Sequence, residues 1–344
     1  MIALFVLAGL VTYQDERFEV VPESVSGGIG ETSFDPLWRL PPVPEGQVDL
    51  VARSRQMLGA RYEVQLPGGG QARCFGDLIR AGLAIEGSRR GAWLDQLEAE
   101  SSARSMPYRY AVRQLLQDDF FRGGDWDPEE SKSTDGFWEG PGWKPTAAML
   151  EDPPWGEVDV GVRLEQATVF IAADLGSIKA AENDYSAYPD DVGAEYDWIY
   201  PVDDAYVRDE NDAFAALEID FKCDLPFPFT GYRCELKILN EIDPLGCLVT
   251  HIYSTSDDFH YMVGKDVFLP VDTSDGARLG YLLVRDFGFD LDNIPDGAKH
   301  RRAGLRSSLG NLRIKAEKIQ QESGREISPV SLDRVPDFRL IGSR

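Results

Sequence analysis

Residues 216–223 read ALEIDFKC and residues 232–238 read YRCELKI, and these two stretches decide the fold of the C-terminal half. In each of them apolar residues alternate with charged ones, which is the period of a β-strand that buries one face. Residues 224–231 (DLPFPFTG) lie between them, and their prolines cannot donate to a sheet ladder. We therefore predict two neighbouring strands joined by a bend or reversal.

Further strands are predicted on both sides of this pair. Apolar runs follow at 247–253, 261–271 and 279–287, and turn-rich breaks of a few residues separate them. Short connections of this kind favour antiparallel neighbours, so we expect a meander. An earlier strand is predicted at 160–171, followed by a short helix at 174–187.

The last element has the period of a helix. Between residues 298 and 319, Leu305, Leu309 and Leu312 recur every three or four positions and form one apolar stripe, while Lys and Arg residues occupy the other face. One antiparallel sheet followed by one long helix is an α+β layout.

The N-terminal half has a different, mainly helical pattern. Its clearest helices are predicted at 91–101 (GAWLDQLEAES) and 108–121 (YRYAVRQLLQDDFF), separated by Pro107. A stretch rich in Gly and Pro at 123–156 is typical of a domain boundary. The role of the helical region is not indicated by any motif.

The chain begins with an apolar run, MIALFVLAGLV at residues 1–11. It is far shorter than the roughly 20 residues of a membrane-spanning helix, so no stable membrane span is expected. The run resembles the core of a secretory signal peptide and predicts export to the periplasm or the cell exterior. The alternative is a buried N-terminal strand or helix in a cytoplasmic protein. The predicted division is a candidate signal peptide at 1–14, a linker-like segment at 15–47, a mainly helical region at 48–154, a second domain at 155–322 and a C-terminal tail at 323–344.

The overall charge argues against one class of partner. With 35 Lys and Arg residues against 59 Asp and Glu residues, the 344-residue chain has a formal net charge of −24. Proteins that grip nucleic acid without sequence preference need clustered basic residues to displace counterions. Nucleic acid is therefore not expected as a partner.

Motifs for catalysis, phosphate or metal are weak. Four cysteines, which allow three disulfide pairings or four free thiols, lie at Cys74, Cys223, Cys234 and Cys247. They form no CxxC pair, and with His251, His260 and His300 they build no zinc spacing, so no metal or cofactor is predicted. Gly68-Gly69-Gly70 lacks the Lys-Ser/Thr of a phosphate loop and predicts a turn. The acidic stretches at 125–130 and 290–297 do not complete a calcium loop and predict solvated loops.

Two stretches resemble a known superfamily. Residues 225–229 (LPFPF) followed by Tyr232-Arg233 look like the proline-rich bend and next strand of START domains, and residues 278–295 look like the last strand of those domains and its exit into the final helix. The chain over 155–322 thus resembles the START-like (SRPBCC) superfamily. That resemblance implies a helix-grip fold, in which a curved antiparallel sheet wraps around a long C-terminal helix, here preceded by a small mainly helical region.

The resemblance also implies a ligand cavity between sheet and helix. The residues expected to line it are Leu217, Ile219, Phe221, Tyr232, Leu236, Tyr281, Leu283, Arg285, Leu305, Leu309 and Leu312. Each apolar member fits a solid core equally well. Arg285 would meet an anionic or polar headgroup if the strand face of 279, 281 and 283 points inward, and would face solvent if the register shifts by one.

Three functions follow as alternatives. The leading hypothesis is binding, and transport, of a lipid or other apolar small molecule without chemical change. The second is a cyclase- or dehydratase-like enzyme that uses the same cavity, although His251 and His260 lie in no GxSxG-type nucleophile motif and no catalytic residue is predicted. The third is a structural or protein-binding module with a filled core.

Overall fold

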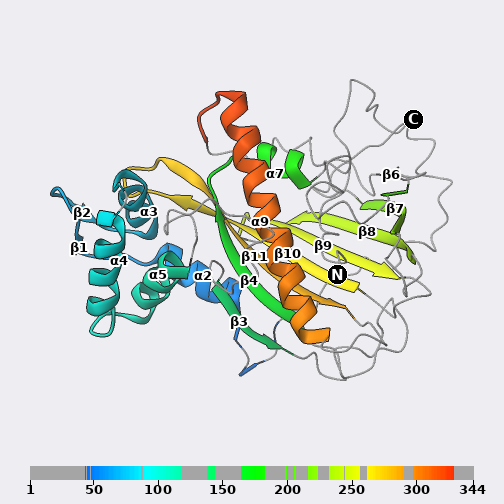
Figure 1. The fold of residues 1–344 in the computed structure, drawn as a ribbon, viewed down its shortest axis with the longest axis horizontal. Coiled ribbons are helices and arrows are strands. Elements are labelled where there is room, and N and C mark those ends of the chain that lie inside the picture. The colour runs from blue at the N-terminus through cyan, green and yellow to red at the C-terminus, as the bar shows by residue number, and fades with distance from the viewer. Residues whose placement is uncertain are drawn as a thin grey trace.

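The computed structural model describes residues 43, 45–46, 48–86, 88–117, 138–143, 164–182, 198–199, 205–206, 216–223, 232–243, 245–255, 262–289 and 297–328. Within these ranges the chain forms six helices and two antiparallel sheets, and the predicted α+β class is confirmed (Figure 1).

The large sheet has nine strands. They are β3 (Trp138–Trp143), β4 (Leu164–Ile171), β5 (Trp198–Ile199), β6 (Ala205–Tyr206), β7 (Ala216–Cys223), β8 (Tyr232–Ile242), β9 (Leu248–Thr255), β10 (Met262–Asp272) and β11 (Arg278–Phe289). Their order is β3-β4-β11-β10-β9-β8-β7-β5, with β6 also paired to β7. Strands β7 to β11 form the predicted antiparallel meander, and β4 pairs with the last strand of that meander.

The C-terminal helix α9 spans Gly297–Ser323 and packs against β4, β11 and the short helix α7 (Leu175–Glu182). The predicted stripe of leucines on α9 is buried. Gly324, with a φ of +63°, directly follows the last residue of α9 and ends the helix. Two side chains of α9 fasten the helix to the segment between β4 and α7. Glu317 Oε1 accepts a hydrogen bond from the Ala172 N–H at 2.8 Å, and Gln320 Oε1 accepts one from the Asp174 N–H at 2.9 Å.

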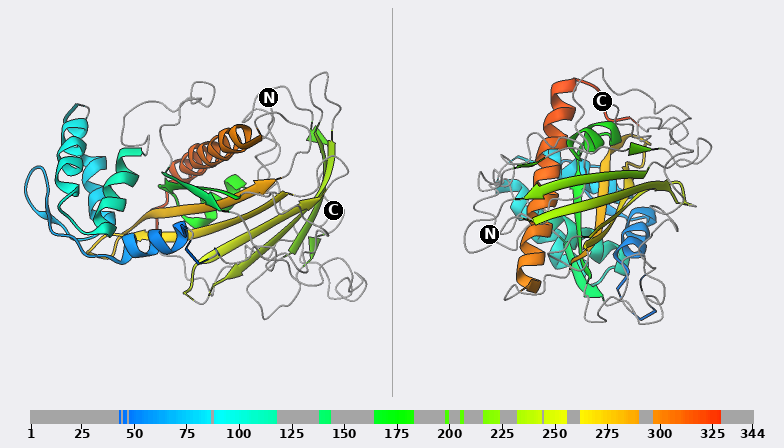
Figure 2. Two further views of the ribbon diagram at one scale, coloured as in Figure 1. Left: turned by 90° about the horizontal axis from the view of Figure 1, so that it is seen from below. Right: turned by 90° about the vertical axis from the view of Figure 1, so that its right-hand side faces the viewer.

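The helical region of the N-terminal half shares one hydrophobic core with the large sheet. Its elements are α2 (Leu50–Gly59), α3 (Phe75–Ala84), α4 (Ser88–Ser101), α5 (Met106–Gln117) and the small hairpin β1 (Val64–Gln65) and β2 (Gln71–Ala72). Phe170, Val267, Leu282 and Val284 on the sheet belong to this core. Because successive strand residues point to opposite faces, Leu283 lies on the other face, the one toward α9. Figure 2 shows these helices at one end of the sheet.

Three local features differ from, or add to, the sequence-based expectations. Pro107 lies in the first turn of α5 rather than between helices, since a helix needs no N–H donor there. The glycines at 68–70 all have positive φ and form the β1–β2 turn, as predicted. Strand β3 lies inside the stretch that was expected to separate two domains, yet it pairs with β4 in the large sheet.

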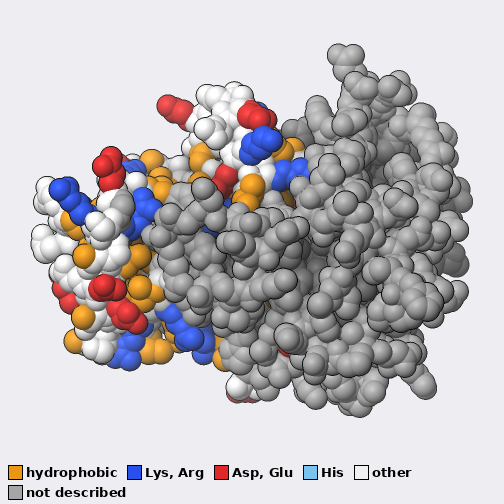
Figure 3. Space-filling model, in the orientation of Figure 1, with side chains coloured by type: hydrophobic (Ala, Val, Ile, Leu, Met, Phe, Trp, Pro, Cys, Tyr) orange, Lys and Arg blue, Asp and Glu red, His pale blue; other side chains and the backbone are white. Residues whose placement is uncertain are grey.

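The outer surface of the N-terminal helices mixes side-chain types. Figure 3 shows apolar, basic and acidic side chains interspersed over them. Leu83 and Met106 are exposed large apolar residues of these helices. Scattered apolar residues of this kind are normal on a protein surface.

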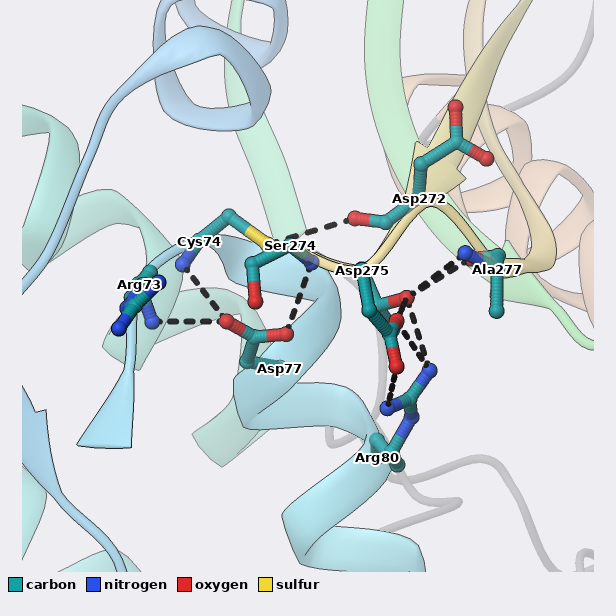
Figure 4. Close-up of polar contacts among 9 residues, drawn as sticks. Arg73, Cys74, Asp77, Arg80, Asp272, Ser274, Asp275 and Ala277 are labelled. Atoms are coloured by element: carbon teal, nitrogen blue, oxygen red, sulfur yellow. Dashed lines mark hydrogen bonds and ion pairs between the residues drawn. The ribbon is translucent and has the colours of Figure 1, made fainter. Parts of the chain in front are cut away.

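Helix α3 docks on the turn between β10 and β11 through polar contacts (Figure 4). Asp77 accepts hydrogen bonds from the backbone N–H groups of Arg73 at 2.8 Å and Ser274 at 2.9 Å. Arg80 donates to both carboxylate oxygens of Asp275, at 2.8 and 2.9 Å. These contacts attach α3 to the turn that joins the end of β10 to the start of β11.

Asp77 makes this docking dependent on pH. Burial acts to raise the pKa of its carboxyl, but the hydrogen bonds from Ser274, Arg73 and Cys74 outweigh burial and lower the pKa. A carboxyl whose pKa is lower in the folded state stabilises the fold above its unfolded pKa, and this contribution is lost as pH falls through the folded pKa.

We expect Asp77→Asn to lower the thermal midpoint at pH 7 and to have a smaller effect at a pH well below the ordinary carboxyl pKa of 3.8, because protonation then removes the contribution of the ionised carboxylate. Thermal unfolding followed by circular dichroism across this pH range measures the difference. An equal loss at both pH values would contradict the assigned role of the carboxylate.

Candidate functional site

A buried ion pair lies on the face of the sheet toward α9. Asp266 of β10 is opposite Arg285 of β11 in the register. Arg285 donates from Nε to Oδ1 at 2.7 Å and from Nη2 to Oδ2 at 2.5 Å, and the two side chains are 2% and 1% exposed. A bidentate pair of this kind satisfies the charge of both groups inside the protein. Thr250 of β9 lies opposite Asp266 on the same face.

Helix α7 brings two more charged side chains to this face. Lys179 Nζ donates to Thr250 Oγ1 at 2.9 Å, lies 2.5 Å from Glu182 Oε2, and stands 5.1 Å from the ring centroid of Phe268. The side chain of Glu182 is only 1% exposed. We call Lys179, Glu182, Thr250, Asp266 and Arg285 the polar cluster. Its formal charges cancel.

Glu182 is the member of the polar cluster with unused hydrogen-bonding capacity. Neither of its carboxylate oxygens has a hydrogen-bond partner in the described part of the chain, although Oε2 lies within ion-pair distance of Lys179 Nζ. Burial raises the pKa of this carboxyl, and Asp266 adds to the rise, while Lys179 and Arg285 oppose it. A buried carboxyl oxygen without a hydrogen-bond partner carries a desolvation cost.

The structure decides between the two alternatives for Arg285. Its side chain is buried on the same face as Tyr281 and Leu283, so the strand residues 281, 283 and 285 point inward. Leu279 departs from the expected face and packs against the core that holds Leu282 and Val284. Its charge is compensated by Asp266 rather than waiting for an anionic group. The Tyr281 hydroxyl, also buried, accepts a hydrogen bond from Arg278 Nη1 at 2.7 Å.

The other predicted wall residues fall on two elements. Leu305, Leu309 and Leu312 of α9 are buried. The remaining five lie on β7 and β8, where the structure describes the backbone: Leu217, Ile219, Phe221, Tyr232 and Leu236. These positions are on the same face of the sheet as Thr250 and Asp266. Ile238 of β8 is opposite Leu217 of β7 and Ile252 of β9, and Ile252 lies two residues from Thr250 on the same strand. That these residues line a cavity stays a prediction.

The opposite face of the sheet carries a second polar row. Asp286 lies opposite both Gln166 and Lys265, and Lys265 lies opposite His251. Gln166 Nε2 donates to Asp286 Oδ1 at 2.5 Å, and Lys265 Nζ is 3.4 Å from Oδ2. Burial raises the pKa of Asp286 against the effect of Lys265. His251 thus belongs to a buried polar row, whereas His260 lies outside the described residues.

The sequence analysis missed Lys179, Glu182 and Asp266. A signal for Asp266 was present, because Lys265-Asp266 and Arg285-Asp286 each interrupt an apolar strand run with a basic and an acidic residue. In an antiparallel pair these dipeptides can form one ion pair on each face. Lys179 and Glu182 give no such signal, since a helix of eight residues with mixed composition has no clear inward face.

Other expectations are tested only in part. Over the described ranges, Cys74 and Cys247 are free thiols, and no group of His, Cys, Asp or Glu residues is arranged to hold a metal ion. The acidic stretch at 125–130 and all of the stretch at 290–297 except Gly297 lie outside the described residues. No described helix combines the length and the apolar character needed to cross a membrane.

Comparison with known proteins adds no relative. No protein-family model matches the chain, and no curated protein matches it either. The START-like resemblance and the expected export therefore stay predictions.

Proposed function

We propose that the protein binds a lipid or another apolar small molecule between α9 and the large sheet, in a helix-grip arrangement like that of START domains. One observation carries the proposal. The α9 side of the sheet has apolar positions from β11 across to β7, while α9 packs on β4 and β11 near one end of that face. A row of apolar positions between a helix and a sheet can line a small-molecule pocket, because such pockets are mostly apolar.

The course of the sheet supports this arrangement. In Figure 2 the sheet turns at its β7 end toward the side on which α9 lies. Such a curve would place the apolar positions of β7 and β8 across from the helix. The polar cluster lies between these two parts, on β9, β10 and β11. A few polar groups in an apolar site are the usual means of orienting a small molecule.

The test compares two neighbouring leucines of β11. Leu283 and Leu282 are both fully buried, but only Leu283 is on the α9 face. Either Leu→Trp change should cost about 1–3 kcal/mol of stability through overpacking. We expect Leu283→Trp to reduce binding of a neutral fluorescent probe, N-phenyl-1-naphthylamine, at least tenfold, and Leu282→Trp to leave binding within about twofold at temperatures where both proteins are folded.

The control separates ligand binding from stability. Equal losses of probe affinity in both variants would mean that binding depends only on the intact core. A parent protein that binds neither the probe nor any lipid extracted from its natural host would overturn the proposal and favour a structural or protein-binding module.

A further inference from the structure

We infer that helix α3 positions Tyr281 in the ligand site, acting through Asp272 and Arg278, so that the N-terminal helical region takes part in binding. The inference rests on the proposed function, since it names what sets the position of one predicted wall residue of that site. It is carried by one continuous set of contacts, which runs from α3 through the end of β10 to the α9 face of β11.

A bulge in β11 brings Arg278 to the α9 face. The register of β10 and β11 shifts between Val271 and Asp272, and Gly280 of β11 has a φ of +149°. Residues three apart on a regular strand point to opposite faces. Here, however, Arg278 Nη1 donates to the Tyr281 hydroxyl at 2.7 Å, and Arg278 Cζ lies 5.0 Å from the centroid of the ring. Bulges that re-aim a side chain in this way are over-represented next to active sites.

Asp272 fixes the guanidinium from the neighbouring strand. Arg278 donates from Nε to Oδ1 at 2.5 Å and from Nη2 to Oδ2 at 3.1 Å, and Nη1 is directed at Tyr281. A bidentate pair sets the plane of a guanidinium as well as its position. The Arg278 side chain is only 10% exposed, so it has little freedom to take another geometry. The position of Asp272 therefore determines where the Tyr281 hydroxyl is held.

Helix α3 lies directly against the backbone of Asp272. The Cys74 thiol donates to the Asp272 carbonyl oxygen at 3.4 Å, and a Cβ at Gly76 would lie 2.2 Å from the same oxygen. A glycine is needed for such a close approach of two backbones. Figure 4 shows α3 beside the β10–β11 turn, where Asp77 and Arg80 bind the residues that follow Asp272. A displacement of α3 would thus displace Asp272.

The Tyr281 phenol can report a displacement of this kind. Burial raises the pKa of Tyr281, and the charge and hydrogen bond of Arg278 oppose the rise. The electron density at the phenol carbon Cζ depends on the same two contacts. An NMR signal from isotope-labelled tyrosine Cζ, assigned to Tyr281 with the Tyr281→Phe variant, therefore measures whether Arg278 is in place. The Arg278→Met variant gives the position of this signal without the contact.

The experiment compares two glycine-to-alanine changes in the N-terminal helices of the full-length protein. Gly76→Ala places a methyl group against the Asp272 carbonyl and should push α3 and the end of β10 apart. Gly91→Ala in α4 is the matched control, because nothing lies within 4 Å of its Cβ position. The Tyr281 signal and the affinity for N-phenyl-1-naphthylamine are measured for each protein.

We expect Gly76→Ala to move the Tyr281 signal most of the way to its position in Arg278→Met. Binding of the probe should weaken roughly fivefold, the size of one hydrogen bond. Gly91→Ala should leave the signal and the affinity at their parent values. If Gly76→Ala does not fold, Asp272→Asn should produce the same two changes, because it weakens the hold on Arg278 at a side chain that is 43% exposed.

The two measurements separate this inference from the proposed function. A parental Tyr281 signal in folded Gly76→Ala, or equal changes in Gly91→Ala, would overturn the role of α3, while probe binding by the parent protein leaves the proposed function intact. A moved signal with unchanged probe affinity would also overturn the inference, since Tyr281 would then belong to the core alone. A parent protein that does not bind the probe would overturn the proposed function, and the place of Tyr281 in a ligand site with it.

Discussion

Replacing Arg285 by Met should lower the free energy of unfolding by about 3–5 kcal/mol, because Asp266 would be left as a buried charge without a partner. Asp266→Leu should cost a similar amount for the opposite reason. The double variant Arg285→Met/Asp266→Leu should recover most of the loss, since it removes both charges and leaves only altered packing. Denaturant unfolding of the four proteins gives the coupling energy of the pair.

An exposed pair of the same chemistry provides the comparison. Arg80 and Asp275 also form a bidentate ion pair, but their side chains are 45% and 65% exposed. Water screens such pairs, so the cycle of Arg80→Met and Asp275→Asn should show a much smaller coupling energy. Similar coupling in the two cycles would contradict the view that burial sets the cost of breaking the Arg285–Asp266 pair.

Strand periodicity made much of the sheet predictable. The alternation at 216–223 coincides with β7, and the runs at 261–271 and 279–287 lie within one or two residues of β10 and β11. The period of two is local, so one strand is enough to reveal it. The leucine stripe located α9 for the same reason, with ends within four residues of the prediction.

Contacts between distant segments were not predictable in this way. The sequence predicts a mainly helical region at 48–154 apart from the second domain, yet its helices share a core with Phe170, Val267 and Leu282 of the sheet. The local sequence pattern of a helix predicts which side is apolar, but it does not predict which other element packs against that side. The same holds for the polar cluster, where Lys179 meets Thr250 across 71 residues of sequence.

Charged residues within apolar strands were the one non-local signal available. Lys265-Asp266 and Arg285-Asp286 have complementary charges when their strands run antiparallel, and the structure forms both ion pairs, one on each face. Burying two such pairs in adjacent positions of one sheet is costly unless geometry is good on both faces. The charged dipeptides on the two strands therefore indicate the register of β10 against β11, and they also indicate where buried polar residues lie.

The second large effect is expected at Gly280 of β11, where the backbone itself leaves no room. Gly280 has a φ of +149°, and a Cβ at this position would lie 2.1 Å from the carbonyl oxygen of Ile171 on the neighbouring strand β4. A backbone oxygen cannot move aside without disturbing the ladder. We expect Gly280→Ala to cost about 2–4 kcal/mol of unfolding free energy, the sum of backbone strain and steric overlap.

Gly276 in the β10–β11 turn separates strain from overlap. It also has a positive φ, +86°, but nothing lies within 4 Å of the position of its Cβ. Gly276→Ala should therefore cost only the left-handed backbone strain, about 1–2 kcal/mol. The Gly280 change should in addition disturb Ala172, whose N–H donates to Glu317 of α9, so it should weaken binding of N-phenyl-1-naphthylamine where Gly276→Ala does not. Equal costs of unfolding in the two variants, measured in urea, would show that β4 and β11 can separate locally and that the close approach at Gly280 does not hold α9 in place.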